Sequence, residues 1–444
     1  MQSLFFTHIE TLKARTENAL ATLGFDALLL GSGSAPRRFL DDTYYPFRTQ
    51  PDFVQWLPQL NQHPGSWLLL QPGRTPKLYL YSPTDFWHQT PQLPTADWTA
   101  AFEIESFGDA QQLGAEFASL GRVALVSAER PAFAVEDWQH NPQPLLDALH
   151  FDRAIKTEWE LHCLREANRI AVRGHLAAEQ AFRAGAGEYR IHQDYLVATE
   201  HNERDLPYDN IVALNEHAAV LHYQFQQRQA PNDPRTLLLD AGATCQGYAA
   251  DITRTHAFDP SSEFGQLIAA LDEAQRGILA NVKAGVDFVD LHLEMHTRLA
   301  QVLADSGLVN ASVEAQLEQG ITRTFFPHGL GHLLGIQVHD AGGWQQDAAG
   351  TLREPPAEHP FLRLTRILQP GFVVTIEPGL YFIPSLLADL RASAAGSAVD
   401  WNRVERLSPF GGIRIEDNVA ITAEGHENLT RDAFEFVSQC QPAG

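Results

Sequence analysis

Residues 237–254 read LLLDAGATCQGYAADITR, in which two apolar strand patterns flank a short turn. A turn at Cys245-Gln246 makes this stretch a β-hairpin and places Asp240 opposite Asp251, with their Cβ atoms roughly 4.5–5.5 Å apart. Two carboxylates that face each other across a strand pair repel unless a cation lies between them. The stretch therefore predicts a β-hairpin that carries a cation site.

Two further acidic residues interrupt apolar strand patterns. Glu377 ends the pattern of residues 372–377, and Glu416 lies within residues 413–421, where alternation places Arg414 and Glu416 on one face. One such residue alone is typical of a surface acid at a strand end. Four carboxylates on apolar strands are costly to bury without compensating charge, which favours a shared site.

A histidine-rich segment supplies ligands of another kind. Residues 327–340 read PHGLGHLLGIQVHD and contain His328, His332 and His339. The first two have the spacing of a zinc-protease helix, but Gly329 occupies the position of the catalytic glutamate, and the glycines and proline disfavour a helix. Three histidines in a glycine-rich loop instead favour ligand or acid–base roles.

The combined donor set indicates a particular metal chemistry. Two aspartates, two glutamates and one imidazole suit manganese, cobalt or zinc. Five side chains hold two metal ions only if carboxylates bridge them, which keeps the ions about 3.5–4 Å apart and acidifies a shared water.

The pattern of the whole chain predicts two domains. Residues 1–154 alternate short apolar runs with helical stretches, as in a smaller α/β domain. Residues 155–444 begin with the capping-box pair Thr157 and Glu160 and combine helices with period-two strands, which indicates an α+β domain. We expect helices at 158–184, 262–283 and 287–305, strands at 210–214, 236–241, 248–254, 372–377 and 413–421, and an insertion at 384–409.

Composition limits the partners and the compartment. Lys and Arg total 32 against 55 Asp and Glu, a formal charge of −23, which disfavours nucleic acid and anionic membranes. The three cysteines do not form a disulfide framework and fit the cytoplasm. No apolar run approaches the ~20 residues of a membrane span, and residues 1–30 predict an amphipathic helix rather than a signal peptide.

In order and local context, the five predicted ligands resemble those of the pita-bread metallopeptidases, which include prolidase, aminopeptidase P and methionine aminopeptidase. The segments FLDD (39–42), YPF (45–47) and NEHAAVLHY (215–223) are similar to those of bacterial Xaa-Pro dipeptidases, a group that includes the organophosphorus acid anhydrolases. The resemblance implies a C-terminal pita-bread domain with a curved antiparallel sheet and flanking helices. It also implies two divalent ions, most readily Mn²⁺, with Co²⁺ or Zn²⁺ as alternatives.

The resemblance assigns roles to individual ligands. It implies that Asp240 holds one metal ion, that His332 and Glu377 hold the other, and that Asp251 and Glu416 bridge the two. A metal-bridging hydroxide then attacks the carbonyl that precedes proline, and Glu377 transfers the proton.

The resemblance also implies roles around the metals. His222 and His339 stabilise the tetrahedral intermediate or donate to the leaving proline nitrogen, and His328 lines the same pocket. The remaining assignments are Arg414 beside Glu416, Arg363 (or Arg366) on the substrate carboxylate, Tyr208 on the pocket wall, and Asp41 (or Asp42) near the substrate amine.

The two aspartates lie in an aromatic segment of the first domain. Residues 39–57 predict a loop that either covers the edge of the core or faces a partner or a site. The resemblance implies a homodimer in which this loop reaches the active site of the other subunit.

Other functions remain open at this stage. Aminopeptidase P, which acts on longer Xaa-Pro peptides, requires the same metals without a carboxylate clamp, and a pita-bread protein without catalytic activity would bind rather than cleave. A serine hydrolase is disfavoured because the sequence has no Gly-x-Ser-x-Gly motif. The resemblance to the anhydrolases also predicts slow hydrolysis of organophosphorus triesters.

Overall fold

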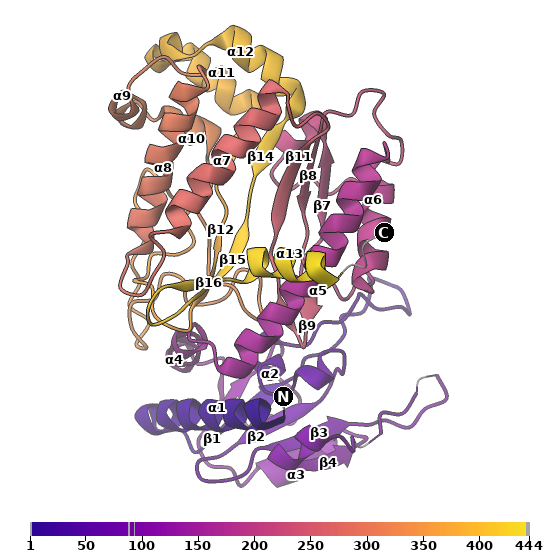
Figure 1. Ribbon diagram of the computed structural model, residues 1–444. Coiled ribbons are helices and arrows are strands. Elements are labelled where there is room, and N and C mark those ends of the chain that lie inside the picture. The colour runs from indigo at the N-terminus through magenta and orange to yellow at the C-terminus, as the bar shows by residue number, and fades with distance from the viewer. Residues whose placement is uncertain (1, 88, 93, 441–444) are drawn as a thin grey trace. The chain divides into compact units, whose positions relative to one another are not determined.

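The computed structural model describes residues 2–87, 89–92 and 94–440, with the backbone alone at residue 115 (Figure 1). The chain divides into two compact units. Unit 1 comprises Met1–Leu161 and Gln345–Thr351, and unit 2 comprises His162–Trp344 and Leu352–Gly444. In the described part of the chain, no helix combines the length and apolar character needed to cross a bilayer.

Unit 1 is built on one mixed sheet with the strand order β4-β3-β2-β1-β5-β6. Strand β2 pairs antiparallel with both β1 and β3, whereas the other three strand pairs are parallel. The elements are α1 (Gln2–Leu23), β1 (Ala27–Gly31), α2 (Pro51–Val54), η1 (Pro58–Leu60), β2 (Trp67–Leu70), β3 (Lys77–Tyr81), η2 (Asp97–Ala101), β4 (Glu103–Phe107), α3 (Gln111–Phe117), β5 (Val123–Val126), β6 (Gln139–His140) and α4 (Gln143–Arg153).

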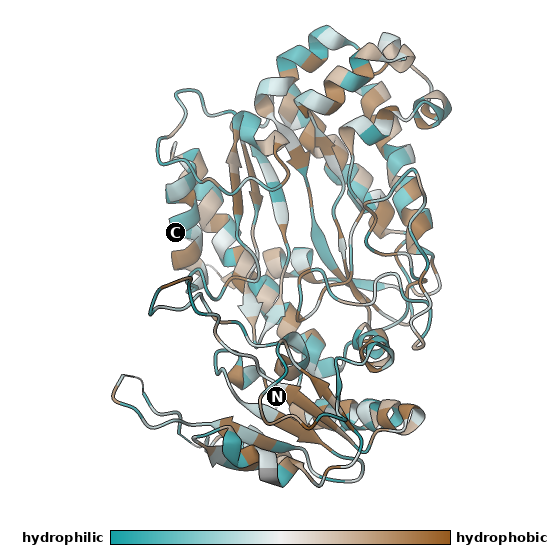
Figure 2. Cartoon of the chain, turned by 180° about the vertical axis from the view of Figure 1, so that it is seen from behind, coloured by the Kyte–Doolittle hydropathy of each residue, from teal (hydrophilic) through white to brown (hydrophobic). Residues whose placement is uncertain are grey.

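The core of unit 1 follows from its strand sequences. Every residue of β1 is buried, because a central strand covered on both faces is apolar throughout. Helix α1 is amphipathic and buries Phe5, Ile9 and Leu12, at helical spacing, as the sequence predicts. Figure 2 shows the central strands of this sheet in brown and α1 in both colours.

The aromatic segment of unit 1 divides into a buried and an exposed part. Phe53 and Trp56 are buried, whereas the side chains of Phe39 and Leu40 are 88% and 91% exposed. A bridge between Arg37 and Tyr44 closes this exposed loop. The tip of the loop therefore does not cover the core edge.

Unit 2 is an α+β assembly whose described strand pairs are all antiparallel. Its sheets have the orders β11-β8-β7, β12-β15-β16, β13-β14 and β10-β9. The strands are β7 (Ile211–Leu214), β8 (Thr236–Asp240), β9 (Thr244–Cys245), β10 (Tyr248–Ala249), β11 (Thr253–Ala257), β12 (Val373–Ile376), β13 (Gly379–Tyr381), β14 (Gly412–Arg414), β15 (Asp417–Ile421) and β16 (His426–Asn428). This arrangement confirms the predicted α+β class.

Helices lie around these strands (Figure 1). They are α5 (Glu158–Arg183), α6 (Glu188–Thr199), η3 (Asn215–Ala219), α7 (Glu263–Leu279), α8 (Phe288–Asp305), α9 (Val313–Glu318), α10 (Ile321–Phe325), α11 (Pro384–Ala392), η4 (Ala394–Ala398), α12 (Trp401–Leu407), η5 (Ser408–Phe410) and α13 (Leu429–Cys440). The capping box that starts α5 is confirmed, since Thr157 N donates to Glu160 Oε2 at 2.7 Å and Glu160 N donates to Thr157 Oγ1 at 3.4 Å. The predicted insertion between two strands is a helical excursion that joins β13 to β14.

The register predicted for the hairpin of residues 237–254 is wrong. The turn lies one residue later, at Gln246-Gly247, where φ is +51° and +80°. Positive φ at both central residues defines a type I′ turn, whose twist suits a tight hairpin. Asp240 therefore pairs with Thr253 rather than with Asp251. Because the shift is two residues along one strand, Asp251 still lies on the same face, as the diagonal neighbour of Asp240.

A buried histidine beneath the hairpin makes unit 2 sensitive to acid. His175 bonds to Ala241 O at 3.0 Å, and burial lowers its pKa to about 3. The unfolded chain therefore takes up more protons between pH 6.5 and 3, so stability falls as the pH drops below 6.5.

We expect His175 to contribute a loss of about 1 kcal/mol between pH 6.5 and 5.5. Urea unfolding of chelator-treated protein at both pH values tests this, with His175→Asn as the comparison. The variant should lose less stability than the parent protein over this interval, and equal losses would contradict the assignment.

Candidate metal centre

The five predicted ligands converge from separate segments of unit 2. Asp240 ends β8, Asp251 precedes β11, His332 follows α10, Glu377 follows β12, and Glu416 lies between β14 and β15. They line one cavity of about 290 Å³. The other lining residues are Leu221, His222, Pro327, His328, Gly329, Gly331, His339, Phe361, Arg363 and Arg414.

The ligand atoms lie close enough to share a cation. One donor atom each from Asp251, His332 and Glu416 lies within 4.8 Å of the others. His332 Nε2 is 3.4 Å from Asp251 Oδ2 and 3.5 Å from Glu377 Oε1. His332 Nδ1 bonds to Leu333 O at 3.0 Å, which makes it the protonated nitrogen and leaves Nε2 free to ligate.

Asp240 is held by its own partners. Tyr208 Oη donates to Asp240 Oδ1 at 2.7 Å, and an Arg414 Nη atom donates to Oδ2 at 2.6 Å. The predicted partner of Arg414 was Glu416, but the direct ion pair is with Asp240. Arg414 reaches Glu416 through Thr253, whose hydroxyl accepts from Arg414 Nε and donates to Glu416 Oε2 at 2.7 Å.

Crowded negative charge shows that the cluster suits cations. Burial raises the pKa of Glu416 well above its ordinary range, and Asp251 and Glu377 raise it further. Burial, with a contribution from Asp251, raises the pKa of Glu377 to about 7. One buried guanidinium, that of Arg414, faces four carboxylates, so divalent ions fit both the charge and the oxygen-rich donor set.

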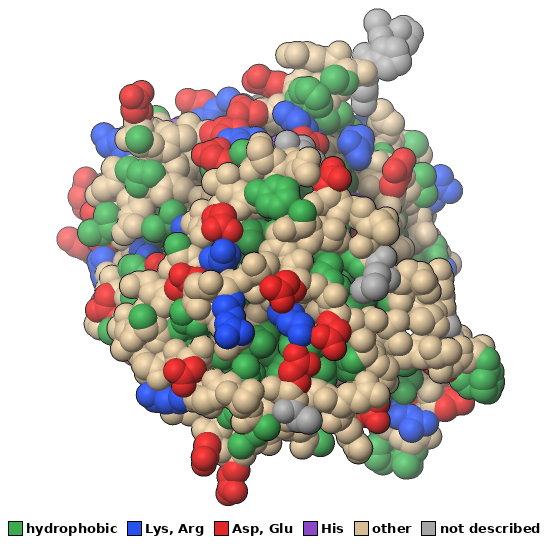
Figure 3. All heavy atoms as spheres, turned by 90° about the horizontal axis from the view of Figure 1, so that it is seen from below, with side chains coloured by type: hydrophobic (Ala, Val, Ile, Leu, Met, Phe, Trp, Pro, Cys, Tyr) green, Lys and Arg blue, Asp and Glu red, His purple; other side chains and the backbone are tan. Residues whose placement is uncertain are grey.

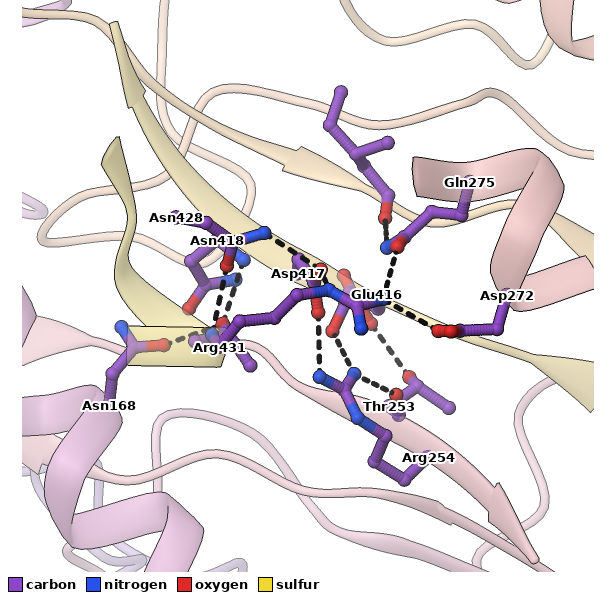
Figure 4. A network of polar contacts seen from close by, with 12 residues as sticks. Asn168, Thr253, Arg254, Asp272, Gln275, Glu416, Asp417, Asn418, Asn428 and Arg431 are labelled. Carbon is purple, nitrogen blue, oxygen red and sulfur yellow. Dashed lines mark hydrogen bonds and ion pairs between the residues drawn. The ribbon is translucent and has the colours of Figure 1, made fainter. Parts of the chain in front are cut away.

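A network behind the cavity fixes the ligand-bearing strands (Figure 4). The side-chain amide of Asn418 bonds to the backbone of Asp251 at both of its polar atoms: Oδ1 accepts from Asp251 N at 3.0 Å, and Nδ2 donates to Asp251 O. The Asn418 backbone N–H donates to Thr430 Oγ1 at 2.9 Å, and Thr430 in turn donates to Asn168 on α5. The position of Asp251 thus depends on a side chain from β15.

Ion pairs extend this network. Asp417 is fully buried and pairs with Arg254 at 2.7 Å and with Arg431 at 2.6 Å. Arg431 also reaches α7 through Asp272 and Gln275, and Gln275 Nε2 donates to Ile376 O beside Glu377. None of these residues was predicted to support the site from the sequence.

We expect Asn418→Ala to weaken Mn²⁺ binding about 10- to 100-fold, as is typical when a residue that orients a metal ligand is removed. Competition against a fluorescent chelator measures this affinity. Asn281→Ala, which removes an exposed amide bonded to Glu294, is the matched control. Unchanged affinity in Asn418→Ala would show that Asp251 keeps its place without this contact.

The remaining residues predicted for the cavity surround the cluster. His328 Nδ1 bonds to Gly329 O at 2.9 Å and lies 3.7 Å from Glu377 Oε2, while its Nε2 bonds to Tyr381 Oη at 2.8 Å. Burial, with the charge of Arg414, lowers the pKa of His328 to about 3, so this ring is neutral. The ring of His339 meets that of His332 edge-on, with centroids 4.4 Å apart.

The two candidate arginines occupy different environments. Arg363 is exposed and lines the cavity, together with His222. Arg366 is buried, stacks on Phe372 at 4.7 Å and is absent from the cavity lining.

Asp41 and Asp42 lie in unit 1 and are exposed. The carboxylate of Asp41 accepts a hydrogen bond from Thr43 N at 2.9 Å, which lowers its pKa.

Comparison with known proteins is consistent with this geometry. Residues 162–423 match the family described as metallopeptidase family M24, and residues 3–151 match the family described as Xaa-Pro dipeptidase, N-terminal domain. The chain is 47% identical over 437 residues to Xaa-Pro dipeptidases from Shigella flexneri serotype 5b and Escherichia coli K12, covering 97% of this chain and 98% of each relative.

Solved structures show a similar architecture. Aminopeptidase P from E. coli with the inhibitor Pro-Leu matches with a TM-score of 0.74 at 23% identity, over 99% of both chains. Aminopeptidase PepP from Pseudomonas aeruginosa matches with a TM-score of 0.74 at 20% identity, over 97% of this chain and 99% of that one. At this identity the likeness concerns the fold, and it confirms the pita-bread architecture.

A metallopeptidase domain that spans more than half of the chain, together with near-complete coverage by 47%-identical relatives, defines the family. The chain belongs to metallopeptidase family M24 and, within it, to the Xaa-Pro dipeptidases.

Proposed function

We propose that unit 2 holds two divalent ions, Mn²⁺ foremost, and hydrolyses Xaa-Pro dipeptides. The observation that carries this proposal is the convergence of four carboxylates and one imidazole in a single cavity, where all but the partly exposed Glu377 are buried. Asp240 would hold one ion, His332 and Glu377 would hold the other, and Asp251 and Glu416 would be shared between the two. The ions, when bound, polarise the scissile carbonyl and acidify the attacking water.

The side chains around the ligands carry out the remaining chemistry. Glu377 accepts the proton of the attacking water on a carboxylate oxygen and passes it to the proline nitrogen. His222 and His339 donate hydrogen bonds to the carbonyl oxygen as negative charge develops on it. His328 is neutral and bonded to Tyr381, so it shapes the cavity wall beside Glu377. The scissile bond precedes proline and lacks an N–H, so no contact to that donor is required.

Selection for dipeptides requires groups that bind both charged ends. Arg363 binds the free carboxylate, because it is the arginine of its segment that lines the cavity, whereas Arg366 packs in the core. Tyr208, which was expected on the pocket wall, is not among the residues that line the cavity; it holds Asp240 through its hydroxyl group.

The substrate amine requires an acid, which we assign to Asp41 of a second subunit in a homodimer. The exposed Phe39 and Leu40 beside it support burial of this loop against a partner. Asp42 is the competing acid, and exchange of each for asparagine distinguishes them through KM.

The surface charge and the cysteines support the expected substrate class and compartment. The face in Figure 3 carries acidic and basic side chains side by side rather than a continuous basic patch, in line with a small-molecule substrate instead of nucleic acid. Among the described residues, Cys163, Cys245 and Cys440 form no disulfide, as is usual in a reducing compartment.

The decisive assay removes metal with a chelator, restores Mn²⁺ and compares Ala-Pro with Ala-Pro-Ala and with Ala-Pro amide. We expect chelation to abolish activity and Mn²⁺ to restore the cleavage of Ala-Pro. Ala-Pro-Ala and Ala-Pro amide should be cleaved far more slowly than Ala-Pro. Preferential cleavage of Ala-Pro-Ala would indicate an aminopeptidase P activity instead. Metal binding without cleavage of any of the three would indicate a non-catalytic binding protein.

A further inference from the structure

A second group of metal-ligand side chains lies in unit 2, and none of its members lines the cavity described above. His292 and His296 lie one turn apart on α8, and His359 comes from the loop before β12. One ring nitrogen from each lies within 4.8 Å of the others. The ring centroids are separated by 4.8, 4.4 and 4.5 Å. We call these three residues the histidine cluster.

The buried members of the cluster have ring nitrogens without partners. His292 is fully buried, and neither of its ring nitrogens has a hydrogen-bond partner among the described residues. His296 Nδ1 bonds to Thr322 Oγ1 at 2.9 Å, while its buried Nε2 has no described partner. Since buried polar atoms in proteins are nearly always paired, such orphaned nitrogens point to a ligand between them.

The rings are in the protonation state that binds metal. Burial, together with the neighbouring imidazoles, lowers the pKa of His292 to about 2 and that of His296 to about 3. Both rings are therefore neutral at pH 7, and neutral imidazole is the ligating form. His359 is only partly buried, so the cluster has a side open to solvent.

We propose that His292, His296 and His359 form a third metal site that binds Zn²⁺ or a similar transition-metal ion. Three imidazole nitrogens with an open fourth position are a recognised zinc geometry. The donor set contrasts with the carboxylate-rich centre, because imidazole favours Zn, Ni and Cu whereas carboxylate favours Mn. In the metal-binding tautomer, the Nδ1–H of His296 donates to Thr322 Oγ1 and leaves Nε2 to ligate, in the way that supporting contacts fix metal-bound histidines.

Geometry and charge define how the site closes. Zn–N distances of 2.0–2.1 Å in a tetrahedral site place ligand nitrogens about 3.3 Å apart, so the partly exposed loop that carries His359 must draw in slightly. Arg323 on α10 opposes a cation near His296 and His359, whereas Glu358 favours one. Helix α8, which carries His292 and His296, and helix α10, which carries Thr322, are both labelled in Figure 1.

The test measures zinc content in four proteins: the parent chain, His359→Ala, His292→Leu and His162→Ala. Each is stripped with chelator, saturated with Mn²⁺, equilibrated against dilute Zn²⁺ and analysed for zinc per chain. His162 is a partly buried histidine of the same unit outside the cluster and serves as the matched control. Zn²⁺ that replaces Mn²⁺ in the carboxylate-rich centre adds the same amount to the zinc content of all four proteins. Differences in zinc content between them therefore measure binding at the histidine cluster.

We expect the parent chain and His162→Ala to bind one more zinc per chain than the other two variants. With Co²⁺ in place of Zn²⁺, the parent-minus-variant difference spectrum should show the intense visible bands of a tetrahedral nitrogen site. His292→Leu removes buried ring nitrogens that have no described partner, and His359→Ala changes a residue in a loop, so both variants should fold. Circular dichroism verifies their folding, and the two variants test the site independently. Equal zinc content in all four folded proteins would overturn the proposal.

Discussion

Glu416→Gln is expected to abolish tight Mn²⁺ binding and to lower dipeptidase activity by a factor on the order of a thousand, beyond the 10- to 100-fold typical of supporting residues. The glutamine oxygen can still accept the hydrogen bond that Thr253 donates to Glu416, so local packing is retained. The amide does not supply the bridging negative charge. Calorimetric titration with Mn²⁺ and turnover of Ala-Pro measure the two effects.

The same substitution should stabilise the metal-free protein. The pKa of Glu416 is raised in the folded state, chiefly by burial and then by Asp251 and Glu377, so the folded chain binds more protons than the unfolded chain above pH 4.5. The stability of the chelated parent protein therefore falls as the pH rises through this range, and Glu416→Gln removes that contribution. Unfolding in urea at pH 7 with chelator should show the variant to be the more stable protein.

Glu405→Gln provides the control for Glu416→Gln, because Glu405 forms an exposed pair with Arg391. Exposed pairs contribute about 0–1 kcal/mol, so this variant should change neither binding nor stability appreciably. If Glu416→Gln bound two Mn²⁺ ions as tightly as the parent protein, the bridging role would be excluded.

Arg363→Met is expected to lower kcat/KM for Ala-Pro about 10- to 100-fold, the loss of about 1.5–3 kcal/mol that accompanies removal of a hydrogen bond to a charged group. Methionine keeps an unbranched side chain on the cavity wall but removes the guanidinium. The rate on Ala-Pro amide, which has no free carboxylate, should be nearly unchanged. Steady-state kinetics on both substrates separates the carboxylate contact from a general effect on the cavity.

Arg366→Met is the matched variant from the same segment. Arg366 is buried against Phe372, so its loss should lower stability while the ratio of rates on Ala-Pro and its amide stays constant. A change of that ratio in Arg366→Met, with none in Arg363→Met, would reverse the assignment of the two arginines.

The sequence predicts that these side chains converge because the signal is local. Asp240 and Asp251 stand at the ends of apolar strand patterns, and burial there is costly unless a cation compensates. The hairpin register is wrong because a type I′ turn with Gln at its first central position lacks the Asn-Gly or Asp-Gly signal. The error changes the pairing of Asp240 by two residues and so leaves Asp251 on the predicted face, which is why the two carboxylates still lie near each other.

Residues that act through distant pairing are much harder to predict. Asn418 follows Arg414 and Glu416 at intervals of two residues, so strand alternation puts it on the same face as these two residues. This alternation is the one sequence signal that could have assigned Asn418 to the site. Its partner, the backbone of Asp251, is 167 positions away in sequence. The histidine cluster shows the same limit, since His359 joins His292 and His296 only through a loop fold that no periodicity encodes.

The most direct test is an anomalous-scattering crystal structure of the Mn²⁺-loaded protein. Two manganese peaks about 3.5–4 Å apart, with Asp251 and Glu416 between them and Asp240, His332 and Glu377 completing their shells, are the predicted result. A map with no manganese in this cavity, or with ions that touch neither bridging carboxylate, would contradict the account.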